Sequence, residues 1–292
     1  MKLLEELTGS ALWTVAAGTA ALGLVAGAVG SFAVLRRQSL QGDMVSHAAL
    51  PGLGVAFLLG AREPVWLIAG GAVAGWIAML CVNAAHRGSR VPFDAALGGA
   101  LAAFFGLGLV LLTYIQRNVP GAAIHPLDRY LFGQAALLRD EDLYAIGGFG
   151  AAALLVLALG WSSFQLVAFD PEYAATLGYR VKLLELLLTT LTVIAVVIGL
   201  KAVGVVLMTA LLVAPCAAAR QWSNRLGGVV LLAALFGALA GLGGTVGGHL
   251  AGRGVPTGPA IVLVATAIVG LSLLFGAARG AFGRRVRNAN PA

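Results

Sequence analysis

The sequence predicts an all-α polytopic membrane protein with eight to nine transmembrane helices. Of its 292 residues, 60% are hydrophobic and only 11% are charged, whereas a water-soluble domain carries about 25% charged residues. The mean hydropathy is +0.94, and several apolar runs reach the roughly 20 residues that a helix needs to cross the hydrocarbon core. The sequence lacks the alternating strands and turns that a transmembrane barrel requires. A single transmembrane domain over residues 1–292 is therefore expected.

Nine hydrophobic segments can be distinguished along the chain. Their approximate bounds are 11–35, 40–60, 64–86, 93–116, 143–166, 182–200, 202–219, 226–250 and 256–278. The sixth and seventh are short, are interrupted by Lys201 and end near Pro215. Such a pair indicates a helix that is broken near residues 200–219 rather than two full spans. The number of crossings is accordingly eight or nine.

The distribution of basic residues predicts the orientation. When the N-terminus is placed outside, 12 of the 19 Lys and Arg residues lie on the cytoplasmic side, where loops of membrane proteins are enriched in positive charge. The C-terminus, with a basic tail at 279–292, is then cytoplasmic. The net charge of +7 follows from this topology, so no nucleic-acid partner is expected.

Asp43 and His47 stand out because they lie in a segment that otherwise avoids charge, GDMVSHAALPGLG at 42–54. A spacing of four places them on one helix face, one turn apart. An aspartate at the centre of a bilayer costs about 2.5–3.5 kcal/mol, and such residues normally face the bundle interior beside a partner. The pair could bind a divalent cation, since carboxylate oxygen suits Mn²⁺ and imidazole nitrogen suits Zn²⁺. It could equally be a structural ion pair or a proton relay, and the spacing alone leaves these three alternatives open.

The other histidines carry weaker signals. His86 stands beside Arg87 at a segment end, where capping of the helix C-terminus is the simpler role. His125 falls in a long polar stretch and is expected to be solvated. His249 ends the eighth segment and is kept as a further candidate metal ligand near an outer vestibule.

The stretch FDPEYAATLGYR at 169–180 predicts a short helix on the cytoplasmic side. Asp170 is a candidate N-cap, Pro171 suits the first helical position, and Gly178 is a stop signal. A helix this short is stable only when something packs on it. The chain also lacks the phosphate-binding motif G-x-x-x-x-G-K-[ST]. It is expected to be a transport subunit without its own ATPase motif, not an enzyme, and to hold no permanently bound cofactor.

Five stretches, in order, resemble the ABC-3 family of metal permeases, the membrane subunits of manganese, zinc and iron importers. The resemblance covers about residues 38 to 278. Met44 departs from it, because the family usually has Ala or Gly there. The five stretches are GDMVSHAALPGLG (42–54), LDRYLFGQAAL (127–137), FDPEYAATLGYR (169–180), AVGVVLMTALLVAPCAAAR (202–220) and VPTGPAIVLVA (255–265).

The resemblance implies a permease like those of type II ABC importers, in the bacterial plasma membrane. Its partners would be a cytoplasmic ABC ATPase subunit, an extracytoplasmic metal-binding protein, a second copy of the chain and the lipid bilayer. Asp43 and His47 would be the metal ligands, four in all around a two-fold axis. The helix at about 170–179 would be the coupling helix that docks on the ATPase. Its matching positions are Asp170, Glu172, Ala174 and Gly178.

The implied cargo is a divalent transition-metal ion. The form SHAALPG resembles the manganese branch, and no His-rich external loop occurs, so Mn²⁺ is expected ahead of Zn²⁺ and Fe²⁺. The alternatives are a metal-chelate permease of the cobalamin or siderophore type and a proton-coupled secondary transporter that uses an Asp–His relay. One difficulty concerns depth. A helix from residue 40 puts Asp43 only about 5 Å from its cytoplasmic end, so either the helix begins earlier or the segment re-enters.

Overall fold

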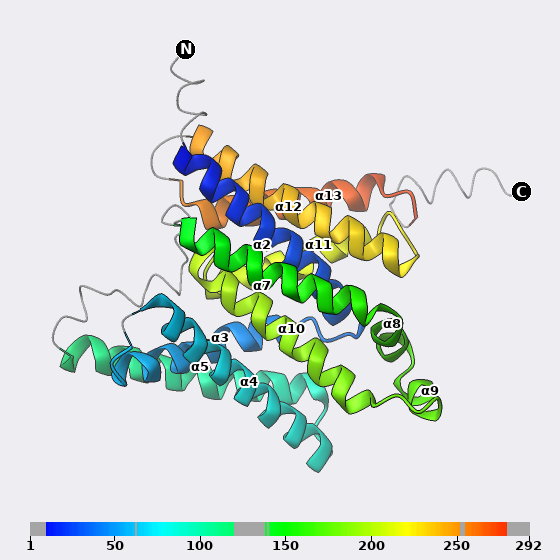
Figure 1. Cartoon of the computed structure of the whole chain (residues 1–292), viewed down its shortest axis with the longest axis horizontal. Helices are drawn as coiled ribbons and strands as arrows, with labels where there is room; N and C mark the ends of the chain where they lie inside the picture. Colours follow the sequence, from blue (N-terminus) through cyan, green and yellow to red (C-terminus); the bar gives the residue numbers. More distant parts are fainter. Residues whose placement is uncertain (1–9, 62, 120–137, 139, 252–254, 279–292) are drawn as a thin grey trace, which may run out of the picture.

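The computed structural model describes residues 10–61, 63–119, 138, 140–251 and 255–278. Their regular elements are helices joined by short turns (Figure 1), which confirms the predicted all-α class. The basic tail at 279–292, His125 and the stretch 127–137 lie outside these residues. The helices are α2 (Ser10–Leu35), α3 (Gln41–Leu58), α4 (Pro64–Gly88), α5 (Phe93–Asn118), α7 (Asp140–Leu159), α8 (Trp161–Phe169), α9 (Pro171–Thr176), α10 (Val181–Ala202), α11 (Val205–Ala219), α12 (Leu226–Leu250) and α13 (Thr257–Phe275).

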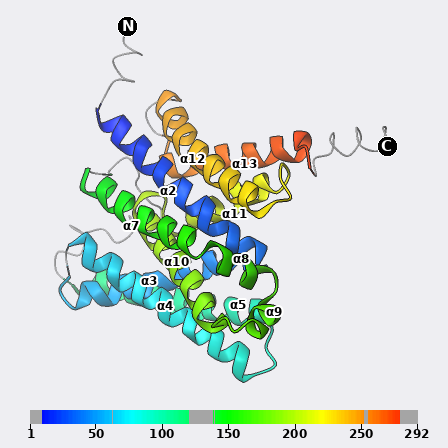
Figure 2. The same cartoon turned by 45° about the vertical axis from the view of Figure 1, so that its right-hand side comes forward.

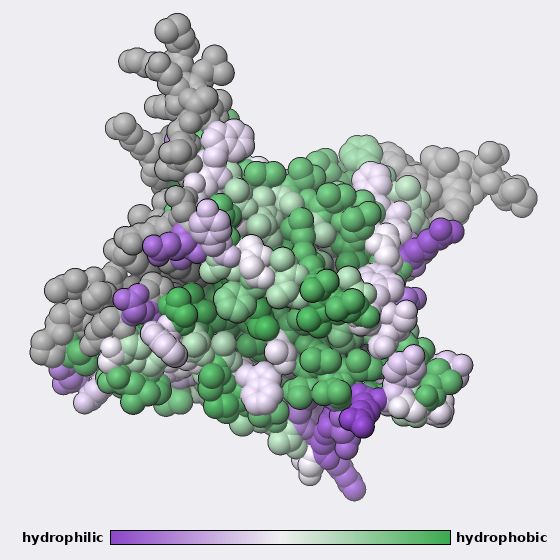
Figure 3. Space-filling view, in the orientation of Figure 1, coloured by the Kyte–Doolittle hydropathy of each residue, from purple (hydrophilic) through white to green (hydrophobic). Residues whose placement is uncertain are grey.

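Seven of the described helices are long and apolar enough to cross a membrane, namely α2, α4, α5, α7, α10, α12 and α13. The two remaining predicted segments correspond to α3, with 18 residues, and α11, with 15. Apolar side chains cover most of the face seen in Figure 3, and the hydrophilic ones lie toward its edges. This distribution is that of a bundle whose outer surface contacts lipid.

The predicted interruption near residues 200–219 falls between α10 and α11. Helix α10 is a full-length span of 22 residues, and Gly204 has φ +87° before α11 begins at Val205. Glycine adopts this region at no steric cost, whereas other residues do not. The sixth segment is thus a complete crossing, and only the seventh is short.

The fifth predicted segment, 143–166, is not one helix. It divides at Gly160 into α7 and the short α8. A Cβ at Gly160 would collide with the ring of Phe164, so the turn depends on glycine at this position. The apolar composition continues across the break, so hydropathy alone does not reveal it.

Helices α2 and α12 form the tightest pair and lie side by side in both cartoon views (Figures 1 and 2). A Cβ added to Gly23 would collide with the backbone of Gly237, and one added to Gly241 would collide with the backbone of Thr19. Small residues allow membrane helices to approach this closely. The hydroxyls of Thr19 and Thr245 also share a hydrogen bond of 2.9 Å across the pair.

One end of the bundle carries α9 and is called the α9 end. The C-terminal ends of α2 and α4 meet the first turns of α5 and α10 there, around a common cavity. Helix α2 starts at the opposite end of the bundle (Figure 1). The two ends therefore correspond to the two membrane faces.

Candidate metal site

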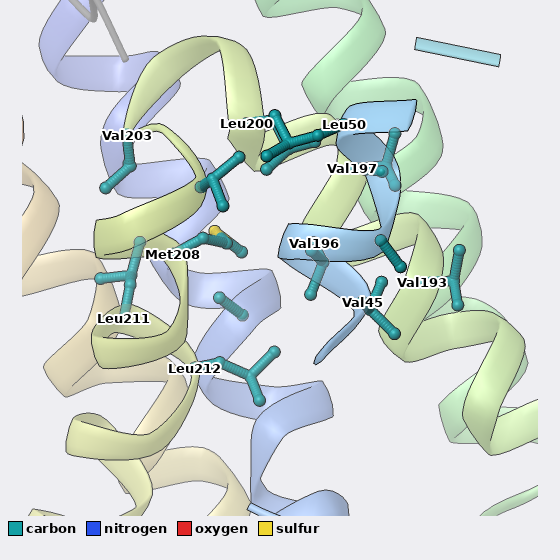
Figure 4. Packing of buried hydrophobic residues seen from close by; sticks show 14 of the residues in the cluster. Val45, Leu50, Val193, Val196, Val197, Leu200, Val203, Met208, Leu211 and Leu212 are labelled. Carbon is teal, nitrogen blue, oxygen red and sulfur yellow. The ribbon is translucent and has the colours of Figure 1, made fainter. Parts of the chain in front are cut away.

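Helix α3 lies inside the bundle rather than on its surface. Thirteen of its residues are buried, and it packs on α4, α5, α10 and α11. Figure 4 shows the apolar contacts that hold it, with Val45 and Leu50 of α3 among side chains of α10 and α11. The partners labelled there are Val193, Val196, Val197, Leu200, Met208, Leu211 and Leu212.

Glycines bring α3 close to its neighbours. A Cβ on Gly52 would collide with the carbonyl of Gly70 on α4. A Cβ on Gly108 of α5 would lie 2.8 Å from the Cβ of Leu50 and 3.1 Å from Cδ of Pro51. Gly52 of the stretch ALPGLG and Gly108 of α5 are thus needed for close helix packing.

The depth of Asp43 follows from the helices beside it. Its partner Thr209 stands ten residues before the end of α11 at Ala219, which corresponds to about 15 Å at a rise of 1.5 Å per residue. Val45 contacts Gly75, which lies 13 residues, or about 20 Å, before the end of α4. Both relations place Asp43 about 15–17 Å from the α9 end. Because α3 starts at Gln41, the helix does not begin earlier, and the connection at 36–40 carries the chain into the bundle.

Asp43 and His47 face each other along α3. The distance from Nε2 of His47 to Oδ1 of Asp43 is 3.5 Å, and the side chains are 16% and 33% exposed, respectively. A charge-assisted hydrogen bond measures about 2.7–2.9 Å, so the two groups are near neighbours that do not close on each other. A distance of 3.5 Å is still within the limit of about 4 Å for an ion pair, so it is compatible both with a metal site and with a structural pair.

Two further residues hold the pair. Oγ1 of Thr209 donates a hydrogen bond of 3.1 Å to Oδ1 of Asp43, and the ring of His47 packs edge-on against Phe105, with ring centroids 4.7 Å apart. Nδ1 of His47 is buried without a hydrogen-bond partner. Both contacts to Asp43 fall on Oδ1, so neither occupies Oδ2.

The proline of the motif adds a backbone oxygen to this region. Pro51 lies inside α3 and has no N–H to donate to the carbonyl of His47, four residues earlier. That carbonyl points toward the C-terminal end of α3, away from Asp43, so the carboxylate of Asp43 and the imidazole of His47 are the oxygen and nitrogen donors that lie one turn apart. Such a mixed set suits Mn²⁺, Fe²⁺ and Zn²⁺ more than soft copper(I).

One chain alone does not complete a coordination sphere. Within the described residues, no group of three or more His, Cys, Asp or Glu side chains could hold a metal ion. Structural zinc sites are four-coordinate and closed, so the Asp43–His47 pair is at most half of such a site. A metal ion bound by this pair would need further ligands from outside the two side chains.

The structure does not bring the other histidines to this pair. His249 is exposed in the last turn of α12, and α12 packs mainly on α2, α11 and α13. His86 lies at the end of α4, where its Nδ1 is 3.0 Å from the carbonyl of Val91. His86 therefore braces the turn into α5, which differs in its partner from the expected cap of α4.

Helix α9 has the local structure that its sequence predicts. Oδ1 of Asp170 accepts a 2.9 Å hydrogen bond from the backbone N–H of Tyr173, and Pro171 opens the helix. Gly178 has φ +84°, the left-handed conformation that ends helices. Only 171–176 are helical, so the helix is shorter than the expected 170–179.

The two faces of α9 differ. Ala174 is fully buried, in a helix that packs on α8. Glu172, Tyr173 and Leu177 are exposed. A short helix that is capped, anchored on one side and free on the other can serve as a docking element.

Sequence reasoning missed Thr209 and Phe105. A signal for Thr209 exists, since it is the one hydroxyl in the apolar stretch VVLMTALLVAP. Phe105 carries none, because an aromatic residue in an apolar span is ordinary.

A model of the ABC 3 transport family matches residues 9–276. The chain belongs to this family. Membership confirms the resemblance seen in the motifs, and four of the five motif stretches lie in described helices, at α3, α9, the α10–α11 turn and α13.

Known members of the ABC 3 family are similar over most of the chain. The zinc transport system membrane protein TroC of Treponema pallidum is 43% identical over 281 residues, which cover 96% of this chain and 93% of that protein. The manganese transport system membrane protein MntC of Bacillus subtilis is 41% identical over 274 residues, 94% of this chain but 62% of that longer protein. Among solved structures, PsaBC from Streptococcus pneumoniae in complex with Fab matches with a TM-score of 0.83 at 29% identity, over 99% of this chain and 100% of that chain.

Proposed function

We propose that this chain is the membrane-spanning permease subunit of an ATP-driven importer of divalent transition-metal ions. The cargo is Mn²⁺, ahead of Zn²⁺ and Fe²⁺, and an extracytoplasmic binding protein delivers it. The observation that carries the proposal is the Asp43–His47 pair, with its two groups 3.5 Å apart and about 15 Å inside the bundle. The names of TroC and MntC, a zinc and a manganese transport protein, support the class of cargo.

The chemistry of the pair suits a transient cation site. A carboxylate attracts a divalent ion twice as strongly as a monovalent one at the same distance, and the attraction grows in a partly dry environment. Two protein ligands in each chain bind too weakly to trap the ion permanently. A second copy related by two-fold symmetry, the commonest arrangement of homo-oligomers, would bring the number of ligands to four.

Energy for transport would come from a separate subunit, because the sequence has no phosphate-binding loop of its own. The exposed side of α9 is the surface on which that ABC ATPase would dock. In this arrangement Asp170 and Gly178 define the two ends of the coupling helix, Ala174 anchors it to the bundle, and Glu172 is presented to the ATPase. Helix α10 follows directly and leads through Gly204 to Thr209, which gives ATPase movement a route to the metal site.

This assignment also sets the topology. The α9 end faces the cytoplasm of a bacterial cell, the N-terminus lies outside, and the C-terminus lies inside. The whole chain is then a single transmembrane domain within the plasma membrane. The excess of basic residues on that side supports the orientation.

The test is cell-associated manganese, zinc and iron, measured by mass spectrometry. Cells would express the permease with its ATPase and binding protein, as wild type, Asp43→Ala, His47→Ala and His249→Ala, at matched membrane abundance. We expect one metal to rise in wild type and to fall to background in the Asp43 and His47 variants. His249→Ala, the matched histidine control, should retain uptake, and a loss there would restore His249 as an outer ligand.

Two results would contradict the proposal. Metal uptake that persists in both Asp43→Ala and His47→Ala would show that the two side chains have only a structural role. Uptake that continues without the ATPase and disappears with a proton ionophore would indicate a secondary transporter with an Asp–His relay instead.

A further inference from the structure

A second polar region lies at the α9 end, between that end of the bundle and the level of the metal site. It is a cavity of about 660 Å³ between the turn after α2, the end of α4, the start of α5 and the first turns of α10. Figure 3 shows hydrophilic side chains beside the end of α4, near α9. Its lining residues do not include Asp43, His47, Phe105 or Thr209.

The cavity has an excess of positive charge. Four permanently charged cations line it, namely Arg36, Arg37, Arg87 and Lys182. The carboxylates that line it are Asp94 and Glu185, and His86 also contributes to the wall. Two positive charges therefore remain uncompensated by the lining residues.

Glu185 is divided between two arginines from different helices. Its Oε1 lies 3.5 Å from Nη2 of Arg36, and its Oε2 lies 3.0 Å from Nη2 of Arg87. Each guanidinium has five N–H donors, so one shared carboxylate leaves most of them free. The cavity thus offers several N–H groups from two directions.

Arg36 needs a second anion more than the others do. Its side chain is only 10% exposed, and its single carboxylate contact is the long one of 3.5 Å. Burial lowers the pKa of the Arg36 guanidinium, and Glu185 acts in the opposite direction. A buried cation is stable only when it is well paired, and one distant carboxylate pairs it poorly.

The backbone conformation of Arg37 also supports an anion site. Arg37 has φ +59°, the one positive φ of a non-glycine residue among the described residues. Its N–H bonds the carbonyl of Val34 while the N–H of Gln38 bonds that of Ala33, the pattern of a helix end where glycine is usual. An arginine held there against its conformational preference is consistent with use of its side chain.

Apolar surface continues from the cavity along the bundle. Ile77 and Leu80 of α4 and Leu183 and Leu187 of α10 are exposed large hydrophobic residues, and α4 packs against α10. Leu80 also lines the cavity. A basic hollow above an apolar strip matches a phosphate head group with acyl chains below it, which free phosphate would not need.

We propose that this cavity binds the phosphate of an anionic phospholipid at the cytoplasmic surface. Arg36 and Arg87 would donate charge-assisted hydrogen bonds to the phosphate oxygens, while Arg37 and Lys182 attract it from the rim. Basic pockets between membrane helices on this side are suited to such head groups. The lipid would brace α2 and α4 against α10, the helix that follows the coupling helix α9.

Native mass spectrometry of the purified full chain in detergent tests the proposal. The ligands are phosphatidylglycerol, phosphatidylcholine and inorganic phosphate, added separately and in competition. The double variant Arg37→Gln with Lys182→Gln removes two exposed rim charges and leaves the buried Arg36 in place. Arg180→Gln with Arg225→Gln removes two exposed charges outside the cavity lining and is the matched control.

We expect wild type to retain one phosphatidylglycerol per chain. At roughly fivefold per cation, the rim variant should bind it about 30-fold more weakly, and the control should bind as wild type does. The charge-conserving variant Arg37→Lys with Lys182→Arg should keep the affinity, which separates loss of charge from misfolding.

Three outcomes would overturn the proposal. Equal retention of phosphatidylglycerol by wild type and the rim variant would exclude the cavity as the site. Displacement of the lipid by inorganic phosphate would keep an anion site but remove the lipid as its occupant. Failure of the rim variant to assemble with the ATPase, with lipid retention unchanged, would assign the cavity to that subunit.

Discussion

Replacement of Thr209 by valine tests whether α11 positions the metal ligand on α3. Valine keeps the branched shape of threonine but lacks the hydroxyl that donates 3.1 Å to Oδ1 of Asp43. The change therefore removes one hydrogen bond and leaves the helix packing almost intact. Thr209→Ser restores the hydroxyl and is the rescue variant.

The size of the effect can be estimated in two ways. A hydrogen bond to a charged group contributes about 1.5–3 kcal/mol. Because the Asp43 side chain is 33% exposed, a water molecule can replace the lost hydroxyl and recover part of this energy. The lower limit, about 1.5 kcal/mol, corresponds to roughly a tenfold change in affinity. Mutation of a residue that orients a metal ligand lowers metal affinity about 10–100-fold. Both estimates predict metal binding about tenfold weaker in Thr209→Val.

The assay is binding of the metal ion to the purified permease, measured as Kd, because uptake by the assembled importer also depends on the metal affinity of the binding protein. We expect Kd to rise about tenfold in Thr209→Val and to stay near the wild-type value in Thr209→Ser. Thr266→Val is the control, since Thr266 is exposed on α13 and bonds its own helix at the carbonyl of Val262. An unchanged Kd in Thr209→Val, or a serine variant that binds the ion as weakly as the valine variant, would refute the positioning role.

Three other substitutions test the framework. Gly237→Ala places a Cβ against the backbone of α2 and should destabilise the bundle by about 1–3 kcal/mol. Thermal unfolding in detergent should show a lower Tm than for the control Gly247→Ala, whose added Cβ meets nothing within 4 Å. Equal Tm values would contradict this packing. Gly204→Ala forces alanine to φ +87° and ψ 167°, a region occupied almost only by glycine, which should cost about 1–3 kcal/mol in the same assay. A gain in stability would exclude that conformation. Asp170→Ala removes the N-cap of α9, which contributes about 1 kcal/mol to helix stability. It should lower metal-stimulated ATP hydrolysis by the assembled importer, whereas Asp170→Asn should preserve it. Full activity in the alanine variant would show that α9 has no role in coupling.

The helical class and much of the helix pattern could be predicted because their causes are local. A charge-poor composition with long apolar runs and no alternating strands indicates spanning helices. Asp170, Pro171 and Gly178 determine the ends of α9 through local interactions and backbone preferences. The division at Gly160 could not be predicted in this way. It arises where the ring of Phe164 leaves no room for a side chain, and that contact belongs to the folded turn.

The sequence by itself also identified Asp43 and His47, since a spacing of four in a helix puts two ionisable side chains on one face whatever surrounds it. Only the tertiary structure decided their depth, because the start of α3 inside the bundle depends on its packing against α4, α10 and α11. It likewise decided their partners. Thr209 reaches Asp43 across 166 positions of sequence, and a contact between residues so far apart in the chain exists only once the helices have packed.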